Sequence, residues 1–501
     1  MTTCSQLRRA FTILVATAAI AATSAPPATA ADAPASPGPL PSATPQAAPS
    51  TLESATPSPI PTATRPRAGV VPTQIAVDFG GDVSNAFALA HIDAQIAREA
   101  ELVPGATIDI RGLTLPSGLR AGDRLDALAS VKISAGDAFA DTVGTTSVHV
   151  EDDAYPKLDP QILLYSDDPE RLVAAADGVL YRATVEAGRS ARVYAYHVSE
   201  TPGRKLYLVL RSIGSAERVQ MLGYTAGPEN AFAYVGHRST AQYLLERGAG
   251  ESSIVDLAPG TPALFDLGGR AMRAGDLIAS IYDLRTLGGG PLEVSVVAVT
   301  GTRDPLELLG GAELAGDGHG RRGEFSLADV PPLAVNFTVG AAEAAPFSIG
   351  APTLANLRPG GRPLGGDYGV LREISLQLTN PTASDATAYF YEAAAGGNAT
   401  TSLWFTGDPA PTEIACVRIP ANRYSIKAFT LAAGETRSVT GEYMTDGTSY
   451  FPLLFGLTAT PPSPPPGPYS ADACTPKSPP PSAVPAAAPA TTESPVPSAS
   501  P

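Results

Sequence analysis

The stretch Arg372–Tyr391, which reads REISLQLTNPTASDATAYFY, constrains the fold more than any other part of the chain. From Ile374 to Leu378 apolar residues alternate with polar ones, and this period of two is typical of a half-buried β-strand. Turn-forming residues at 380–385 interrupt the alternation, and an aromatic segment, 387–391, follows. We therefore predict a strand, a turn and a second strand, paired as a hairpin within an antiparallel β-sandwich.

A weaker copy of this pattern occurs earlier, at Arg204–Tyr224. When Arg204 is aligned with Arg372, three alternating leucines of the first stretch fall on the three alternating apolar residues of the second. Alternating leucines are common in strands, so two interpretations stay open. Either the two stretches belong to diverged copies of one sandwich, or their agreement is due to chance.

The composition favours a β-rich exported protein, and we expect an all-β fold of two to three antiparallel β-sandwich domains. The 501 residues include 50 prolines and 48 glycines, and only 17% of residues are charged. Frequent turns and few charges are atypical of a helical enzyme, and the length allows about three domains.

We expect the chain to divide as follows: a signal peptide, 1–30; a disordered Pro/Ala/Ser-rich linker, 31–72; a small β-sandwich, 73–156; a larger β-sandwich, 157–302; a Gly-rich irregular connector, 303–366; a C-terminal β-sandwich, 367–460; and a disordered Pro-rich tail, 461–501.

Three segments have ambiguous or helical patterns. Residues 85–101 fit both a helix capped by Asn85 and a strand, and the surrounding β pattern favours the strand. Short helices are expected at 172–176, after an acidic residue and a proline, and at 240–247, capped by Ser239 and ended by Gly248.

The amino terminus resembles an export signal. Arg8 and Arg9 precede an apolar run, 10–22, which is too short and too alanine-rich for a stable membrane span. Small residues at Ala28 and Ala30 provide a cleavage site. We predict a secreted or cell-envelope protein with no membrane span after cleavage; the alternative is an uncleaved anchor.

The net charge argues against nucleic acid as a partner. The formal charge is −15 at pH 7, and no basic patch with interspersed aromatic residues is present. Such a chain is repelled by DNA, RNA and anionic lipid. We interpret the acidity as a contribution to solubility.

Two cysteines, Cys416 and Cys474, follow the expected signal peptide. In an oxidising compartment such a pair predicts a disulfide bond. It would join the start of the tail to the C-terminal sandwich and would contribute up to about 4 kcal/mol in the chain-entropy model. The alternative is two unpaired thiols.

No motif for catalysis or for a cofactor is evident. The chain lacks G-x-S-x-G and H-E-x-x-H, and its five histidines are scattered. We expect a non-enzymatic protein with no cofactor and no metal. For His197 we expect either a sheet residue on the face without tyrosines or a hydrogen-bonded core histidine. A catalytic triad assembled across domains stays open, since triads are spatial. Calcium held by Glu151, Asp152, Asp153 and Asp159 also stays open, although we favour a solvated acidic linker.

Three aromatic residues are candidates for ligand contact. Tyr389 and Tyr391 share one strand face and Phe390 takes the other. If Phe390 lies in the core, both tyrosines point outward and could stack on a sugar ring or a partner protein. Trp404 is the third candidate, and core packing is the alternative for all three.

Several strings, LLYSDDPE, GVLY, the strand with His197, and GDYGV before the alternating leucines, resemble uncharacterised secreted bacterial proteins with immunoglobulin-like sandwiches. The resemblance covers 160–455 and implies no activity. We therefore predict a structural, adhesive or binding role at or beyond the cell envelope, with cell-wall or surface polysaccharide, or another envelope protein, as partner. The alternatives are a secreted hydrolase of polysaccharide or peptide and a calcium-stiffened adhesin.

Overall fold

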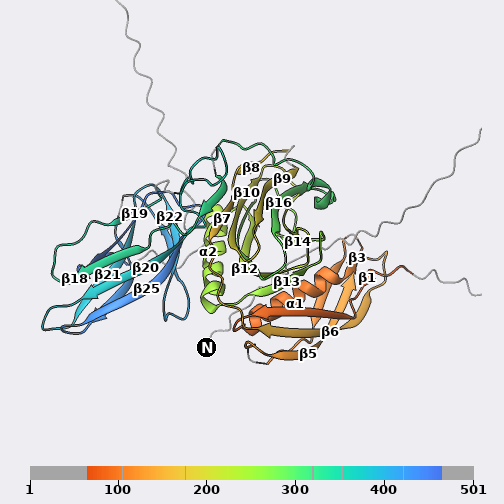
Figure 1. The fold of residues 1–501 in the computed structure, drawn as a ribbon, viewed down its shortest axis with the longest axis horizontal. Helices are drawn as coiled ribbons and strands as arrows, with labels where there is room; N and C mark the ends of the chain where they lie inside the picture. Colours follow the sequence, from red (N-terminus) through yellow and green to blue (C-terminus); the bar gives the residue numbers. More distant parts are fainter. Residues whose placement is uncertain are drawn as a thin grey trace, which may run out of the picture.

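Strands dominate the structure, and three β-rich parts follow one another along its longest axis (Figure 1). Several sheets form these parts, so the chain is mostly β, as predicted. The expected signal peptide, most of the expected linker and nearly all of the expected tail lie outside the described residues. The computed structural model describes residues 65–103, 105–116, 118–174, 177–318, 321–350, 354–420 and 422–464.

The N-terminal part is a mixed sheet covered by a helix, with a separate two-stranded sheet beside it, and not the expected small sandwich. In the mixed sheet β2 pairs with β6 in parallel, and β5 and β4 continue it antiparallel. Residues 69–70, which we expected in the linker, form a strand that pairs with β3. The elements are β1 (Gly69–Val70), β2 (Gln74–Gly80), α1 (Asn85–Glu99), β3 (Glu101–Leu102), β4 (Thr107–Arg111), β5 (Arg124–Ser134) and β6 (Thr142–Asp153).

Helix α1 occupies the segment for which we favoured a strand, so that prediction was wrong. The Ser84 side chain, not that of Asn85, caps the helix by accepting the Phe87 N–H at 3.3 Å. Ile92 and Ile96 are fully buried, and their spacing of four residues places them on one helix face. A parallel β2–β6 pair requires a long crossover, and α1 lies within that crossover.

The middle part is a sandwich whose larger sheet continues into the N-terminal sheet. Its elements are β7 (Ile162–Ser166), β8 (Arg171–Leu172), β9 (Gly178–Val185), β10 (Ser190–Ser199), β11 (Arg204–Ser212), β12 (Glu217–Glu229), α2 (Phe232–Ala249), β13 (Ser253–Leu257), β14 (Pro262–Asp266), β15 (Leu277–Thr286), β16 (Leu292–Thr300), the 3₁₀ helix η1 (Pro305–Leu308) and β17 (Arg322–Ser326). The strand order is β17-β7-β10-β15-β12-β13-β2-β6-β5-β4, with β8 beside β10. The second sheet, β14-β11-β16-β9, packs on it around a buried aliphatic core.

The junction between the first two parts is a strand pairing. Ser253 of β13 lies opposite Phe79 of β2, and Ile254 lies opposite Asp78. The expected boundary near residue 156 is therefore crossed by a continuous sheet.

Helix α2 begins earlier than the predicted helix, 240–247, and it passes Gly248, the glycine that we expected to end it. Gly250 has φ 77°, a left-handed conformation that favours glycine, and closes the helix. Ser239 lies inside the helix, where its hydroxyl donates to the Gly236 carbonyl. The helix expected at 172–176 is absent from the described part of that segment, where Arg171–Leu172 is strand β8.

The C-terminal part is a sandwich of two sheets, β18-β20-β25-β22-β23 and β19-β26-β21-β24. It includes two strands that lie in the expected connector, 303–366, whereas β17 of that connector joins the middle sheet. Its strands are β18 (Leu333–Thr338), β19 (Phe347–Ile349), β20 (Leu371–Thr379), β21 (Ala386–Ala394), β22 (Ala399–Phe405), β23 (Thr412–Val417), β24 (Tyr424–Leu431), β25 (Thr436–Thr445) and β26 (Leu453–Thr458).

Strands β20 and β21 form at the predicted positions, although β21 extends past the predicted 387–391 to Ala394, and they do not pair as a hairpin. β20 pairs with β18 and β25, and β21 pairs with β24 and β26 in the opposite sheet. The buried Asn380 side chain holds this crossing: its amide donates to the carbonyls of Leu431 (3.2 Å) and Ala432 (2.9 Å). The turn is thus bonded to the β24–β25 connection, and both strands can direct their apolar residues into one core.

The earlier stretch, Arg204–Tyr224, crosses in the same way. β11 belongs to the small sheet of the middle sandwich, and β12 belongs to the large one. Both aligned arginines, Arg204 and Arg372, are buried at the start of these units. Among the described residues, no helix is both long enough and apolar enough to span a membrane.

Candidate functional site

The three candidate aromatic residues lie in different surroundings. Tyr391 is only 2% exposed. The Arg423 guanidinium lies over the tyrosine ring, with its Cζ atom 4.6 Å from the ring centroid. Phe390 is fully buried in the core, and a bulge between it and Tyr391 disturbs the simple alternation. Tyr389 is half-buried.

Trp404 is half-buried against α2. A Cβ atom added to Gly248 would approach the Trp404 ring to 2.2 Å, so a glycine allows this close contact. The tryptophan therefore joins the C-terminal sandwich to the helix.

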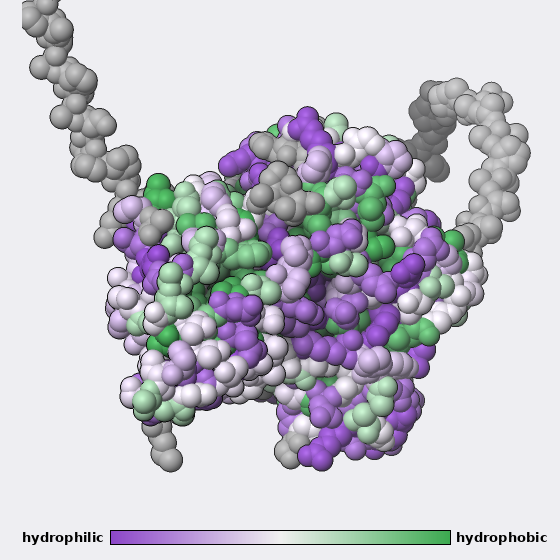
Figure 2. Space-filling view, turned by 60° about the vertical axis from the view of Figure 1, so that its left-hand side comes forward, coloured by the Kyte–Doolittle hydropathy of each residue, from purple (hydrophilic) through white to green (hydrophobic). Residues whose placement is uncertain are grey.

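On the face that Figure 2 shows, hydrophobic and hydrophilic residues are interspersed, and no single large hydrophobic area covers it.

Cys416 is buried in β23, and Cys474 lies outside the described residues. The disulfide between them stays a prediction.

His197 is a buried sheet histidine of the kind predicted. Its Nδ1 donates to the Pro169 carbonyl (2.8 Å), which leaves Nε2 to accept the Ser166 hydroxyl (2.9 Å). This resembles the hydrogen bonding of a serine–histidine pair, but both residues are 0% exposed. Burial lowers the pKa of His197 to about 4, so the ring is neutral at pH 7. Its hydrogen bonds hold it within the sheet.

The acidic residues at the first boundary do not converge. Glu151 and Asp153 contact the Arg124 side chain, while Asp152 is buried and Asp159 is exposed. Burial, with a smaller effect of neighbouring carboxylates, raises the pKa of Asp152 to about 7. Within the described ranges, no group of three or more His, Cys, Asp or Glu side chains is arranged to hold a metal ion.

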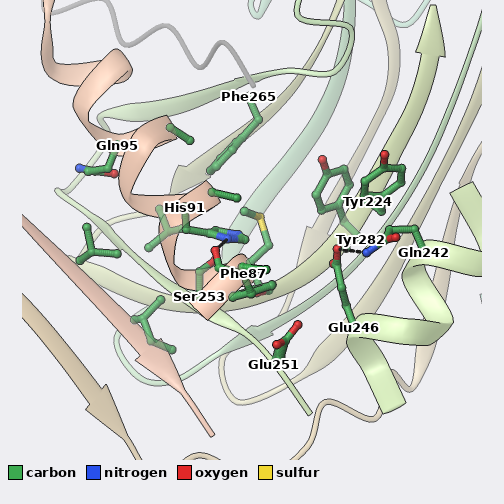
Figure 3. Close-up of a pocket in the computed structure, with 18 of the residues that line it drawn as sticks. Phe87, His91, Gln95, Tyr224, Gln242, Glu246, Glu251, Ser253, Phe265 and Tyr282 are labelled. Atoms are coloured by element: carbon green, nitrogen blue, oxygen red, sulfur yellow. Dashed lines mark hydrogen bonds between the residues drawn. The ribbon is translucent and has the colours of Figure 1, made fainter. Parts of the chain in front are cut away.

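A cavity of about 510 Å³ lies between α1 and α2 and is the candidate ligand site (Figure 3). Ligand pockets of proteins typically measure about 300–1,000 Å³. Helix α1 supplies one side and the last turns of α2 another, and residues of β2, β12, β13, β14 and β15 complete the lining. The site therefore depends on the continuous sheet that joins the first two parts.

The lining is mainly apolar. Its larger apolar side chains are Phe87, Met221, Leu245, Ile254 and Phe265. Small residues of α1, among them Ala90, leave the space open. An apolar lining of this kind is typical of sites for small organic molecules.

His91 stands at the centre of the α1 side (Figure 3). Its ring stacks on Phe87 with centroids 3.9 Å apart, and its Nδ1 donates to the Phe87 carbonyl at 3.0 Å. Burial lowers the pKa of His91 to about 4. At neutral pH the ring is therefore uncharged and suits an apolar cavity.

Glu246 is the unusual polar group of the cavity. Its Oε1 accepts the Gln242 amide at 3.1 Å, from one helical turn earlier, while Oε2 is buried and accepts no hydrogen bond within the described residues. Burial raises the pKa of Glu246 from its ordinary 4.5 to about 8; the Gln242 hydrogen bond opposes this shift, and the charge of Glu251 adds to it. At pH 7 the carboxyl is mostly protonated, because an unpaired buried carboxylate is costly.

Sequence reasoning missed this site, although weak signals were present. Phe87, His91, Ala94 and Arg98 have the spacing of one helix face, which would have required the helical interpretation of 85–101. Nothing in the sequence indicated that Glu246 would meet that face.

A cluster of charged side chains lies at the contact between α2 and the C-terminal sandwich. His237 Nδ1 lies 2.5 Å from Asp446 Oδ2, and its Nε2 lies 2.9 Å from Glu413 Oε2. Burial acts to lower the pKa of His237, but the two carboxylates outweigh it and raise the value to about 9. A protonated His237 therefore links the helix to the sandwich.

This link predicts a loss of stability as the pH rises. The pKa of His237 is higher in the folded protein than its ordinary 6.5, so its contribution is complete below pH 6.5 and disappears as the pH passes 9. The difference between the two pKa values corresponds to about 3 kcal/mol of folding free energy. Melting temperatures measured between pH 6 and 9.5 should fall more steeply for the natural protein than for His237→Gln.

The comparison with His237→Gln isolates this group. Three buried acids, Asp152, Glu246 and Glu392, also titrate near pH 7–8 in the folded protein, and their effects are common to both proteins. Parallel curves for the two proteins would contradict the prediction.

Comparisons with known proteins do not identify a family. No protein-family model and no curated protein matches the chain. Tripeptidyl peptidase 2 aligns with 71% of this chain, which covers 29% of that protein, at 10% identity and a TM-score of 0.16. The tandem CBM22 domains of Paenibacillus barcinonensis Xyn10C align with 57% of this chain and 99% of their own, at 8% identity and TM-score 0.13. A Paenibacillus xanthan lyase aligns with 72% of this chain and 36% of its own, at 11% identity and TM-score 0.15. Each of these three TM-scores is below 0.2, and none of the alignments assigns the chain to a fold or a family.

Proposed function

We propose that this is an exported, non-enzymatic binding protein of the bacterial cell envelope or its surroundings, built on immunoglobulin-like sandwiches. Its binding site is the cavity between α1 and α2, which takes a small apolar molecule. The observation that supports this proposal is the cavity itself, about 510 Å³ in volume with a mainly apolar lining. Cell-wall or surface polysaccharide, or another envelope protein, is the proposed partner of the outer surface.

The cavity is a better basis for a binding role than the aromatic residues of the C-terminal sandwich. Tyr391 is only 2% exposed, and Trp404 packs closely against Gly248 of α2. The cavity, in contrast, has room for a ligand among side chains that already face it.

Ala90→Trp is expected to reduce binding of a neutral apolar dye, Nile red, at least tenfold. Ala90 is an exposed residue of α1 that lines the cavity, so a tryptophan there fills the space without disturbing the core. Dye fluorescence, titrated with the full chain, measures the change.

The matched control is Glu99→Trp, which adds the same ring to an exposed position of α1 outside the cavity lining. Equal dye binding by both variants and the natural protein would place the dye elsewhere. Absence of dye binding by the natural protein would contradict the proposed function.

A further inference from the structure

The chemical class of the ligand follows from the polar groups of the cavity, and this inference rests on the proposed function. Two carboxyl groups line the cavity from one side, Glu246 in the last turn of α2 and Glu251 just after the helix (Figure 3). Both come from the same short segment of chain. Their combined preference is for a positively charged hydrogen-bond donor.

The two carboxyl groups differ in what they already bind. Glu251 is 6% exposed, and its Oε1 accepts the Ser84 N–H (2.9 Å) at the start of α1. Glu246 Oε2 is buried without a hydrogen-bond partner among the described residues. A buried polar atom left in this state is unfavourable, and a ligand that donates a hydrogen bond there removes that cost.

The other charged or titratable groups of the lining already have partners or come from elements other than α2. Asp266 pairs with Lys205 at 2.7 Å, and the Tyr282 hydroxyl lies 3.0 Å from that of Thr225. Tyr224 contributes its hydroxyl from β12. His91 is neutral at pH 7, and Arg98 enters from the last turn of α1.

We propose that the cavity binds a small apolar molecule that carries a primary amine, with the ammonium group against Glu246 and Glu251. The apolar part of the ligand lies against Phe87, Met221 and Phe265, which supply the larger apolar surfaces of the lining. An ammonium group has three donors, enough to reach Glu246 Oε2 and a second acceptor at once.

Binding of an ammonium is coupled to a proton. Because Glu246 has a pKa of about 8 when the cavity is free, it must release its proton to form the ion pair. Affinity for the amine therefore rises about tenfold from pH 6 to pH 7, levels off above pH 8, and falls only when the amine itself loses its proton near pH 10.

The test compares three probes of nearly equal shape, namely phenylbutylamine, phenylbutanol and phenylbutyrate, by isothermal titration calorimetry of the full chain. At pH 8 the amine is expected to bind at least tenfold more tightly than the alcohol. At pH 7, titrations in two buffers of different ionisation enthalpy should show release of nearly one proton per amine bound.

Glu246→Gln is expected to abolish both the proton release and the preference for the amine. Glu307→Gln, at an exposed position of η1 outside the cavity, is the matched control and should change neither. The comparison of probes on the natural protein needs no variant, so a misfolded Glu246→Gln would not remove the test.

The outcomes separate this inference from the proposed function. If alcohol and amine bind equally and Ala90→Trp weakens both, the cavity is a binding site but the amine proposal is wrong. If phenylbutyrate binds most tightly, Arg98 dominates recognition and the amine proposal is again wrong. If none of the probes binds, and Nile red does not bind either, the proposed function fails as well.

Discussion

Replacement of Asp283 by alanine is expected to lower the free energy of unfolding by about 3–5 kcal/mol, because it leaves buried arginine charge without its partner. Asp283 is 0% exposed and accepts hydrogen bonds from Arg192 Nε (2.7 Å) and from the Tyr243 hydroxyl (2.7 Å). Arg247 lies 3.5 Å away and also pairs with Glu442 of the C-terminal sandwich. The carboxylate therefore connects β15, β10 and α2.

Urea denaturation of the full chain measures this effect, and a double variant tests its cause. If the cost comes from the unpaired guanidinium, adding Arg192→Met to Asp283→Ala should recover part of the loss. Equal instability of the single and double variants would contradict this explanation. Asp141→Ala removes a partner of the exposed Lys132 and is expected to change stability little, because exposed pairs are screened by water.

Phe390→Ala is expected to cost about 3–5 kcal/mol, the range for deleting a fully buried phenylalanine. The Phe390 ring is 0% exposed and packs edge-on against Phe405 and stacked with Phe455, with centroids 5.8 and 5.9 Å apart. Its removal leaves a cavity between the two sheets of the C-terminal sandwich.

The neighbouring residue provides the control for this prediction. Tyr389 is half-buried on the opposite face of the same strand, so Tyr389→Ala should cost much less in the same denaturation experiment. A larger loss of stability for Tyr389→Ala than for Phe390→Ala would mean that Tyr389, and not Phe390, faces the core.

The strands of the C-terminal sandwich could be predicted from local patterns, but their partners could not. The alternation from Ile374 to Leu378 depends only on which face of a strand is buried, and the structure buries these apolar residues as expected. A turn of Asn380–Asp385 fits both a hairpin and a crossing between sheets. The hydrogen bonds of Asn380 to the distant carbonyls of residues 431 and 432 decide for the crossing.

Residues 85–101 show how tertiary context overrides a local pattern. Their apolar residues fit two periods, and the β-rich surroundings favoured the wrong one. In the structure β2 and β6 are parallel neighbours, and the long connection between them has room for a helix that covers the sheet. This information lies in a pairing of distant segments, outside any local window.

The sequence by itself determined the mostly β class, most strand positions and the buried faces of the alternating strands, because these depend on side-chain polarity at neighbouring positions. Only the tertiary structure decided which sheet each strand joins, that the first two parts share one sheet, and that α1 and α2 enclose a cavity. The candidate site belongs wholly to the second group. Glu246 is an ordinary surface-type residue in the sequence, and its raised pKa arises from burial beside segments more than a hundred residues away in the chain.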